Sequence, residues 1–395
     1  MSWPLVKLGE LVEIKGGGTP SKQVEEYWNG HIPWASVKDF KSSVLYKTED
    51  CITQAGVDNS ATNIISAGTI IVPTRMALGK VALTGCDMAI NQDLKALLIK
   101  DEKKICTKFL LRFLESKADY IEAQGQGATV KGIKLDVLRG LETPLPPLPE
   151  QKRIATILDK ADQLRQKRRQ AINLTDEFLR SVFLEMFGDP ESAGWDLVTV
   201  ESLLANHKGS MRTGPFGSQL LHSEFTDSGI AVLGIDNAVK NVFKWAKPRF
   251  ISGEKYQQLK KYTVYPGDVL ITIMGTCGRC AVVPDDITPA INTKHLCAIT
   301  LDQSKCLPRF LHSYFLMHPA AKKYLAAKAK GAIMSGLNMG VIKELPVPAA
   351  PLALQQKYQA VCQKYDHIIT NLNVASQISG DNFNSLSQKA FAGQL

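Results

Sequence analysis

The chain repeats its own pattern, and this duplication constrains its fold more than any other feature. Residues 2–12 (SWPLVKLGELV) align without a gap with residues 194–204 (GWDLVTVESLL). The similarity continues in register: AINQDLKALLI from Ala89 matches AINTKHLCAIT from Ala290, and GATVKGI from Gly127 matches GAIMSGL from Gly331. A repeat of about half the chain is far longer than the roughly 20–50 residues of solenoid repeats. The sequence therefore predicts two similar modules that carry two similar but non-identical surfaces.

Each module is followed by a proline cluster and a long helical segment. ETPLPPLPEQK from Glu142 matches ELPVPAAPLALQQK from Glu344 once three residues are inserted. Prolines favour extended backbone and are excluded from helix interiors, so each cluster predicts a stiff hinge. From Glu150 to about Phe187 there is no Gly or Pro, and apolar residues recur at three- and four-residue steps, which predicts one long helix with one apolar stripe. A second such helix is predicted from about Leu354 to Phe391.

The two apolar stripes need partners, and each helix can supply the other. A two-fold relation between the halves favours an antiparallel pair, while packing of each helix on its own module remains an alternative. The predicted fold class is α+β, with two pseudo-symmetric mixed α/β recognition modules separated by two long helices that form an antiparallel coiled coil. The predicted domains are residues 1–148, a central helix at 149–190, a second module at 191–350 and a C-terminal helix at 351–395.

Composition limits the class of protein. A hydrophobic content of 45% and a charged content of 22% are ordinary for a globular protein. The net charge of +9 suits a polyanionic partner without proving one. Among eight cysteines only Cys277 and Cys280 form a CxxC, and the nearest further ligands, His295 and Cys297, lie in a predicted strand, so we predict reduced cysteines and no metal site. With no leader-like start and no run of ~18 apolar residues, we expect a cytoplasmic protein.

Catalytic motifs are missing. The sequence has no GxxxxGK[ST] phosphate loop, no HExxH, no Asn/Asp-Pro-Pro-Phe/Tyr tetrad of an amino-methyltransferase, and no convincing nuclease carboxylate cluster. Gly125-Gln126-Gly127 follows a predicted helix rather than a strand, which indicates a connecting loop. We therefore predict a non-catalytic chain that binds no cofactor of its own.

Features typical of nucleic-acid binding recur in both copies. Each module begins with a loop of small residues that includes a base, GGGTPSK at 16–22 and KGSMRTGPFGS at 208–218, which would allow close approach to phosphate. Arg and Lys read guanine and Asn and Gln read adenine. Any one such residue could be a solvated loop or turn residue, but their recurrence at equivalent loops favours DNA contact. The candidate DNA-binding residues are Gly18, Thr19, Ser21, Lys22, Trp34, Lys38, Arg75, Lys80, Asn91, Gln92 and Lys131 in the first copy, and Lys208, Ser210, Arg212, Thr213, Ser218, Asn237, Arg279, Asn292 and Lys294 in the second.

The framework matches between the copies while these loops diverge, as TPSKQVEEYWNG against RTGPFGSQLLHSEF shows. Two readers of two different sequences would need this arrangement. The first long helix also has more apolar surface near its end than a two-stranded seam requires. This surplus predicts a subunit-docking surface at Ile172, Leu179, Phe183 and Phe187.

These residues together resemble the specificity subunit of type I DNA restriction-modification systems. The resemblance is carried by GGGTPSK and YWNGHIPW within 16–34, INQD at 90–93, PLPPLPEQKRIATILDKAD at 144–162, TGPFGSQL at 213–220, LPVPAAPLALQQKY at 345–358 and the final KAFAGQL. In the second copy Leu354-Gln355-Gln356-Lys357 replaces Glu-Gln-Lys-Arg. The match covers the whole chain.

The resemblance implies that each module is a target-recognition domain for one half of a split double-stranded DNA site. The helices would set the half-site spacing and dock methyltransferase subunits, and a motor-nuclease subunit would join the complex. S-adenosylmethionine, ATP and Mg would then be bound only by those partners. Two alternatives stay open from the residues: a fused methyltransferase or nuclease, and a scaffold that binds only proteins. DNA affinity that falls steeply with salt would exclude the scaffold.

Overall fold

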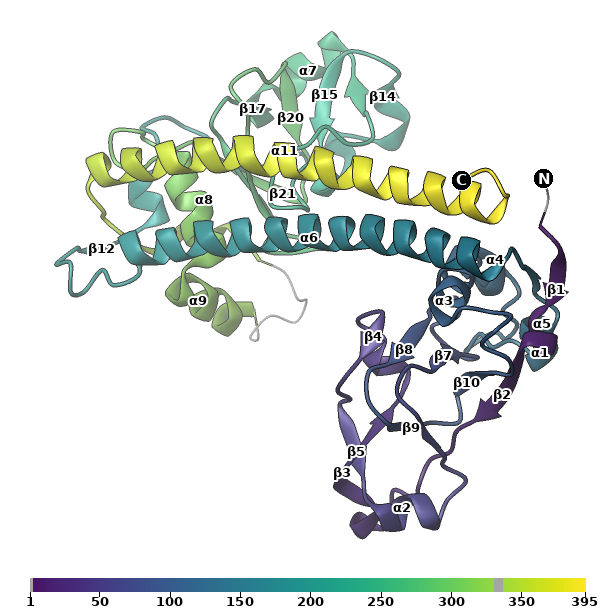
Figure 1. Ribbon diagram of the computed structural model, residues 1–395. Helices are drawn as coiled ribbons and strands as arrows, with labels where there is room; N and C mark the ends of the chain where they lie inside the picture. Colours follow the sequence, from purple (N-terminus) through teal and green to yellow (C-terminus); the bar gives the residue numbers. More distant parts are fainter. Residues whose placement is uncertain (1–2, 330–336) are drawn as a thin grey trace. The chain divides into compact units, whose positions relative to one another are not determined.

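The computed structural model describes residues 3–329 and 337–395, so most of the GAIMSGL repeat lies outside the described residues. The chain divides into two compact units. The first unit contains Met1–Gln170 and Asn373–Leu395, and the second contains Ala171–Leu372. Each unit therefore holds one module together with half of each long helix (Figure 1).

The first module is built on two sheets. The five-stranded sheet has the order β2-β10-β7-β8-β4, and the four-stranded sheet has the order β5-β3-β9-β6. In the smaller sheet β3 and β9 run parallel, whereas β5 and β6 are antiparallel to their neighbours. The strands are β1 (Leu5–Lys7), β2 (Val12–Gly16), β3 (Trp28–Ala35), β4 (Val44–Leu45), β5 (Asp50–Ile52), β6 (Ile64–Ile65), β7 (Ile70–Pro73), β8 (Ala82–Thr84), β9 (Met88–Ile90), β10 (Leu94–Ile99) and β11 (Glu142–Pro144).

The second module repeats this plan. Its sheets have the orders β13-β21-β18-β19 and β14-β16-β15-β20-β17, and β15 runs parallel to β20 as β3 does to β9. In both modules the opening strand pairs with the proline-rich hinge, Leu5 with Pro144 in β1–β11 and Leu197 with Pro348 in β12–β22. The strands are β12 (Leu197–Thr199), β13 (Met211–Thr213), β14 (Phe225–Thr226), β15 (Ile230–Leu233), β16 (Phe250–Ile251), β17 (Thr263–Val264), β18 (Val269–Thr272), β19 (Cys280–Val282), β20 (Ala290–Asn292), β21 (Leu296–Ile299) and β22 (Pro346–Pro348). The predicted duplication is confirmed.

The two long helices are α6 (Leu148–Phe187) and α11 (Leu352–Phe391). In the first unit, the Arg165 guanidinium lies 4.4 Å from the centre of the Phe383 ring. In the second, the rings of Phe183 and Tyr358 are 5.3 Å apart. A second contact in each unit gives the direction: Arg168 donates to the carbonyl of Ala375 in the first, and Tyr365 donates to the carboxylate of Asp176 in the second. Residue numbers rise along α6 while they fall along α11, so the pairing within each unit is antiparallel, as predicted. The helix α11 also continues through Gly380.

A buried glutamine attaches each long helix to its own module. The Gln151 side chain accepts a hydrogen bond from the backbone N–H of Cys106 at 2.8 Å and donates to the carbonyls of Lys104 and Pro146. Gln355 makes the equivalent bonds, accepting from Leu307 at 2.8 Å and donating to the carbonyls of Lys305 and Ala350. Both amides are fully satisfied in a buried site, which makes the attachment specific. The motif around Gln151 therefore keeps this contact in the second copy, despite its divergent neighbours.

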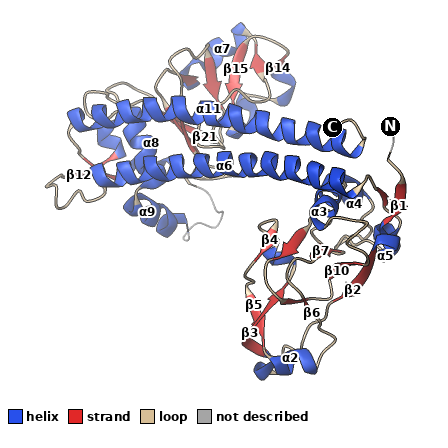
Figure 2. Cartoon of the chain, viewed as in Figure 1, coloured by secondary structure: helices blue, strands red, loops and turns tan. Residues whose placement is uncertain are grey.

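Of the shorter helices, α3 and α8 lie against the long helices, whereas α2 and α7 lie at the far ends of their modules (Figure 2). Phe109 and Phe113 of α3 pack against Phe391, and Phe310 of α8 packs against Phe187. None of the helices in the described ranges combines the length and apolarity that a membrane crossing requires. The short helices are α1 (Leu8–Leu11), α2 (Gln54–Asp58), α3 (Thr107–Ser116), α4 (Ala118–Ala123), α5 (Leu135–Arg139), α7 (Gly253–Leu259), α8 (Pro308–Met317), α9 (Pro319–Ala329) and α10 (Met339–Lys343).

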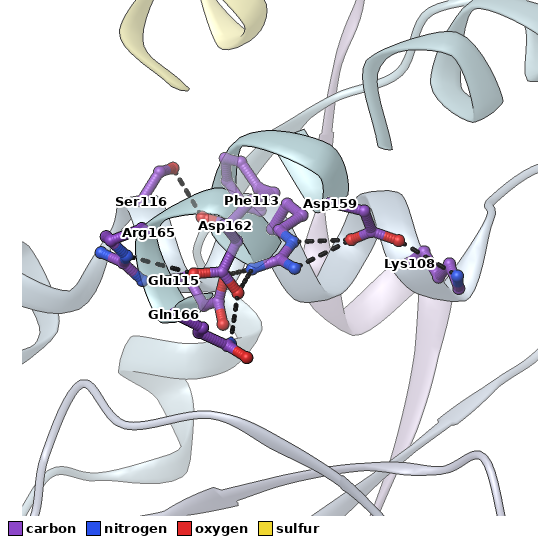
Figure 3. Close-up of polar contacts among 9 residues, drawn as sticks. Lys108, Phe113, Glu115, Ser116, Asp159, Asp162, Arg165 and Gln166 are labelled. Atoms are coloured by element: carbon purple, nitrogen blue, oxygen red, sulfur yellow. Dashed lines mark hydrogen bonds and ion pairs between the residues drawn. The ribbon is translucent and has the colours of Figure 1, made fainter. Parts of the chain in front are cut away.

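In the first unit an ionic cluster fixes α3 to α6 (Figure 3). The buried Arg112 guanidinium contacts carboxylates of Glu115 at 2.8 Å, Asp159 at 2.9 Å and Asp162 at 3.0 Å. Burial alone would lower the pKa of Arg112, but the surrounding carboxylates raise it instead. Burial also raises the pKa of Glu115. Such a cluster specifies one docking geometry, because any other leaves charges buried without partners.

The predicted docking surface on α6 is wrong for three of its four residues. Leu179, Phe183 and Phe187 belong to the core of the second unit, with 5%, 0% and 1% of their surface exposed. The extra apolar width near the end of α6 serves contact with α8 and α11 rather than a partner. Only Ile172 keeps a half-buried side chain.

Candidate nucleic-acid interface

In each module two parallel strands end side by side, β3 and β9 in the first and β15 and β20 in the second. The loop of small residues passes directly against these strand ends. A Cβ on Gly17 would lie 2.0 Å from the carbonyl oxygen of Ile90, and one on Gly214 would lie 1.9 Å from that of Asn292. The backbone N–H of Gly18 donates to the same Ile90 carbonyl at 3.0 Å. Glycine is therefore needed at these two positions so that the chain can pack on itself, whereas the approach of the loops to phosphate stays a prediction.

This contact brings predicted residues of the first module together. The hydroxyl of Thr19 donates to the side-chain oxygen of Gln92, which is exposed just beyond β9. Arg75 reaches the same turn, with its guanidinium 3.9 Å from the Asp93 carboxylate. At the equivalent turn of the second module, Lys294 is half-buried and follows Thr293. The two turns thus have the same backbone and different side chains.

A second loop is also shared by the modules. Met76 and Gly275 have φ of +70° and +72°, and Gly79 and Gly278 have φ of +81° and +78°. The loops after β7 and β18 therefore adopt left-handed backbone conformations at matching positions. This places two exposed basic side chains, Lys80 and Arg279, at equivalent sites. The amine of Lys80 donates to the carbonyl of Phe40 at 3.2 Å. The backbone carbonyl of Lys131 accepts from Met76 at 3.0 Å, so Lys131 joins this loop in the first module.

Seven predicted DNA contacts are buried and hold the module together instead. The Trp34 indole N–H donates to the Gly18 carbonyl at 3.0 Å, and the Asn91 side chain accepts from the Asp93 N–H at 3.1 Å. The Asn292 amide donates to the Leu296 carbonyl at 2.8 Å. Polar groups in these positions satisfy buried backbone rather than face a ligand. The buried candidates are Gly18, Trp34, Asn91, Ser210, Arg212, Asn237 and Asn292.

Arg212 is the clearest of these corrections. Its guanidinium pairs with the fully buried Asp268 and donates to the Thr263 carbonyl at 2.7 Å. Burial raises the pKa of Asp268 in spite of this pairing. An arginine in such a site cannot leave it without stranding a buried carboxylate, so it is unavailable to DNA.

The remaining candidates keep accessible side chains at the loops. The sequence-based candidates miss the loop before β16. Its segment KNVFKWAKPR alternates basic and aromatic residues, but none of the exposed ones was among the candidates. The accessible candidates are Thr19, Ser21, Lys22, Lys38, Arg75, Lys80, Gln92, Lys131, Lys208, Thr213, Ser218, Arg279 and Lys294.

The described residues gather no set of metal ligands. They contain no group of three or more His, Cys, Asp and Glu side chains placed to hold a metal ion. Burial raises the pKa of the Cys280 and Cys297 thiols, the latter to about 12, which disfavours the thiolate that metal ligation needs. The absence of a cofactor stays a prediction.

Comparison with known proteins agrees with this architecture. A family model described as the type I restriction modification DNA specificity domain matches residues 2–174 and 224–378. The MjaIX specificity subunit of Methanocaldococcus jannaschii is 24% identical over 93% of this chain and 88% of its own length. The EcoR124I/EcoR124II specificity subunit of Escherichia coli is 38% identical over 40% of each chain. A crystal structure of the S subunit from M. genitalium is 17% identical, covers 99% of this chain and 96% of its own, and has a TM-score of 0.61, which shows the same fold.

Proposed function

Because the chain belongs to the family of type I restriction-modification DNA specificity domains, we propose that it is the DNA specificity subunit of such a complex. Each module reads one half of a bipartite double-stranded DNA target. The observation that carries this proposal is one scaffold present twice with different side chains at the same turn, half-buried Thr19 and exposed Gln92 in one copy and half-buried Thr293 and Lys294 in the other. An unchanged backbone with changed donors and acceptors is what two different half-sites require.

The decisive experiment replaces one module. Residues 1–148 are exchanged for the equivalent module of a relative, and modified adenines are mapped in DNA from cells that also express the methyltransferase partner. One half of the recognised sequence should change while the other half and the spacing stay the same. A change in both halves would contradict independent reading.

The long helices act as the spacer between half-sites in this proposal. The Gln151 and Gln355 contacts support it, because they fix the start of each helix on its module. Insertion of one heptad after Gln170 should alter the preferred spacing and leave the bases of each half-site unchanged. Unchanged spacing would indicate flexible tethering.

Catalysis belongs to partner subunits. We expect the purified chain to transfer no methyl group from S-adenosylmethionine to DNA until methyltransferase subunits are added. ATP and Mg would act only with a motor-nuclease subunit. Since the proposed ligand is cellular and invading DNA, we place the protein in the cytoplasm.

A docking surface for methyltransferase subunits is proposed on exposed apolar residues of the helices, in place of the buried Phe183 and Phe187. Leu174 and Ile368 are 56% and 49% exposed in the second unit, and Leu164 and Ile378 are 49% and 52% exposed in the first. The pairs are equivalent under the repeat, since Leu164 corresponds to Ile368 and Leu174 to Ile378 when α6 and α11 are aligned from their first residues. We infer that these exposed apolar side chains, two in each unit, belong to a larger apolar patch of the kind that marks an interface.

A Leu174→Asp, Ile368→Asp variant should lose co-purification with the methyltransferase and keep its fold, because both side chains are exposed. Glu177→Ala, at an exposed neighbour on α6, is the matched control. Intact complex formation by the double variant would place docking on the modules.

A further inference from the structure

The loop between β15 and β16 presents an exposed indole. Trp245 is 57% exposed, although a tryptophan normally buries much of its large apolar surface. All five tryptophans are among the described residues, and the other four are buried or half-buried. Its ring makes an edge contact with Phe243 at 5.4 Å, which holds it in place.

The base of this loop is braced by the buried Asn237. The Asn237 amide donates to the carbonyl of Lys244 at 2.9 Å, and the Lys244 N–H donates back to the Asn237 carbonyl at 3.1 Å. The Asn237 oxygen also accepts from the Gly234 N–H at 2.9 Å. These bonds fix the residue directly before Trp245, so the indole is presented by a rigid support. Asn237 is thus a positioning residue.

Charge and shape around the indole are complementary to a polyanion. Residues 235–249 contain one acidic residue, Asp236, which pairs with Arg249. The same segment contains four basic residues, Lys240, Lys244, Lys247 and Arg249. Beside Trp245 lies a hollow of about 250 Å³ that is lined by Lys247, Arg249 and Phe250 among others. The Nε–H of Arg249 is buried and has no acceptor among the described residues.

The first module has a similar loop with an exposed aromatic side chain and fewer unpaired basic residues. Its loop between β3 and β5 carries Tyr46, which is 68% exposed. Asp39 braces that loop as Asn237 does, accepting from the backbone N–H of Ser36 at 2.7 Å and of Glu49 at 2.8 Å. One of its lysines, Lys41, is paired with Glu49 at 2.6 Å. An exposed aromatic on a braced, basic loop therefore recurs in both copies.

We propose that the β15–β16 loop binds the DNA duplex beside the second half-site, with Trp245 packed against the deoxyriboses of the backbone and Lys244 and Lys247 on the flanking phosphates. This inference rests on the proposed function and adds a contact that supplies affinity rather than sequence selection, because every nucleotide offers a sugar and a phosphate. Tyr46 has the corresponding role in the first module.

The test uses the full chain, purified with its methyltransferase subunits, and a pool of random-sequence duplexes followed by the target duplex. Trp245→Ala should weaken binding to both by about 10-fold, because the indole no longer buries apolar surface against the sugars. Trp245→Phe should recover part of the loss. Lys244→Ala with Lys247→Ala should weaken binding and reduce its salt dependence by about two phosphate contacts. Lys322→Ala with Lys323→Ala, two exposed lysines of α9, is the matched control and should bind as the unmodified chain does.

Iodide quenching gives a readout independent of affinity. The part of tryptophan emission that disappears in Trp245→Phe should be quenched by iodide in the free protein and protected in the DNA complex. The half-site bases found by methylation mapping should not change. Unfolding curves of the variants should match the unmodified chain, since the indole lies outside the core.

Each contrary result separates the two proposals. If the unmodified complex binds no DNA, the proposed function fails. If it binds DNA and Trp245→Ala binds equally well, or the indole stays open to iodide in the complex, the inference about this loop is overturned while the function stands. If Trp245→Ala instead loses its methyltransferase subunits and the remaining protein keeps its DNA affinity, the loop is a protein contact and the inference is also overturned.

Discussion

Replacing Arg112 by methionine tests how the first module is fixed to its helices. The substitution leaves Asp162, with 4% of its side chain exposed, without its main buried counter-ion. Removing one partner of a buried ionic cluster costs about 3–5 kcal/mol. Asp162 keeps Arg165 at 2.6 Å and Asp159 keeps Lys108 at 3.0 Å, so we expect the lower end, about 3 kcal/mol.

A second substitution isolates the cause. Asp162→Leu removes the most deeply buried of the stranded carboxylates, so the variant with both Arg112→Met and Asp162→Leu should recover about 1–2 kcal/mol of the loss, and Glu115 accounts for the rest. Glu115 adds a pH signature. Its pKa in the folded protein lies above 4.5, and Arg112 lowers that pKa. Loss of Arg112 raises the folded-state pKa of Glu115 further. The variant therefore loses stability as the pH rises from 4.5 through this folded-state pKa, where the buried carboxyl must ionise. The deficit of Arg112→Met should therefore shrink as the pH falls towards 4.5.

Hydrogen exchange under increasing urea measures each unit separately, which is necessary because a chain of two units need not unfold in one step. Peptides from α3 and the start of α6 report on the first unit, and peptides from α8 serve as the internal control. Equal destabilisation of the single and double variants would refute the reasoning, because the loss would then come from packing around Arg112 and not from an uncompensated charge.

Three further outcomes follow from the second unit. His312 donates from Nε2 to the carbonyls of Asn241 and Cys280, and burial lowers its pKa from 6.5 to about 4. The neutral ring stabilises the fold fully above pH 6.5, and about 3 kcal/mol of stability should be lost as the pH falls from 6.5 to 4. Measurements of unfolding against pH should show no such loss for His312→Gln. Gly214→Ala should lower the unfolding temperature of this unit and abolish reading of its half-site, because the Cβ meets the Asn292 carbonyl at 1.9 Å, whereas Gly253→Ala, with open space around it, should change neither. Gln355→Ala should cost about 1–3 kcal/mol in urea unfolding, since it leaves buried backbone groups unpaired; a neutral result would mean that water replaces the amide.

Much of the architecture follows from the sequence alone. The duplication, the hinges and both long helices are local patterns, since a 3.6-residue apolar period and proline clusters act through nearby backbone. The antiparallel pairing follows from the repeat by symmetry. The equivalence of Lys80 and Arg279 is likewise visible in the alignment, because the loop conformation around them is set by glycine and its neighbours.

The role of each polar loop residue was decided by tertiary structure. Arg212 and Arg279 both lie in segments rich in small residues, but Arg212 is in β13 and meets Asp268, 56 residues away along the chain, whereas Arg279 stays exposed in a loop. Phe183 and Phe187 look like surplus apolar surface until Phe310 of α8 covers them. Burial depends on which distant segments arrive at a site, so no local pattern separates a residue that braces a loop from one that is free to bind DNA.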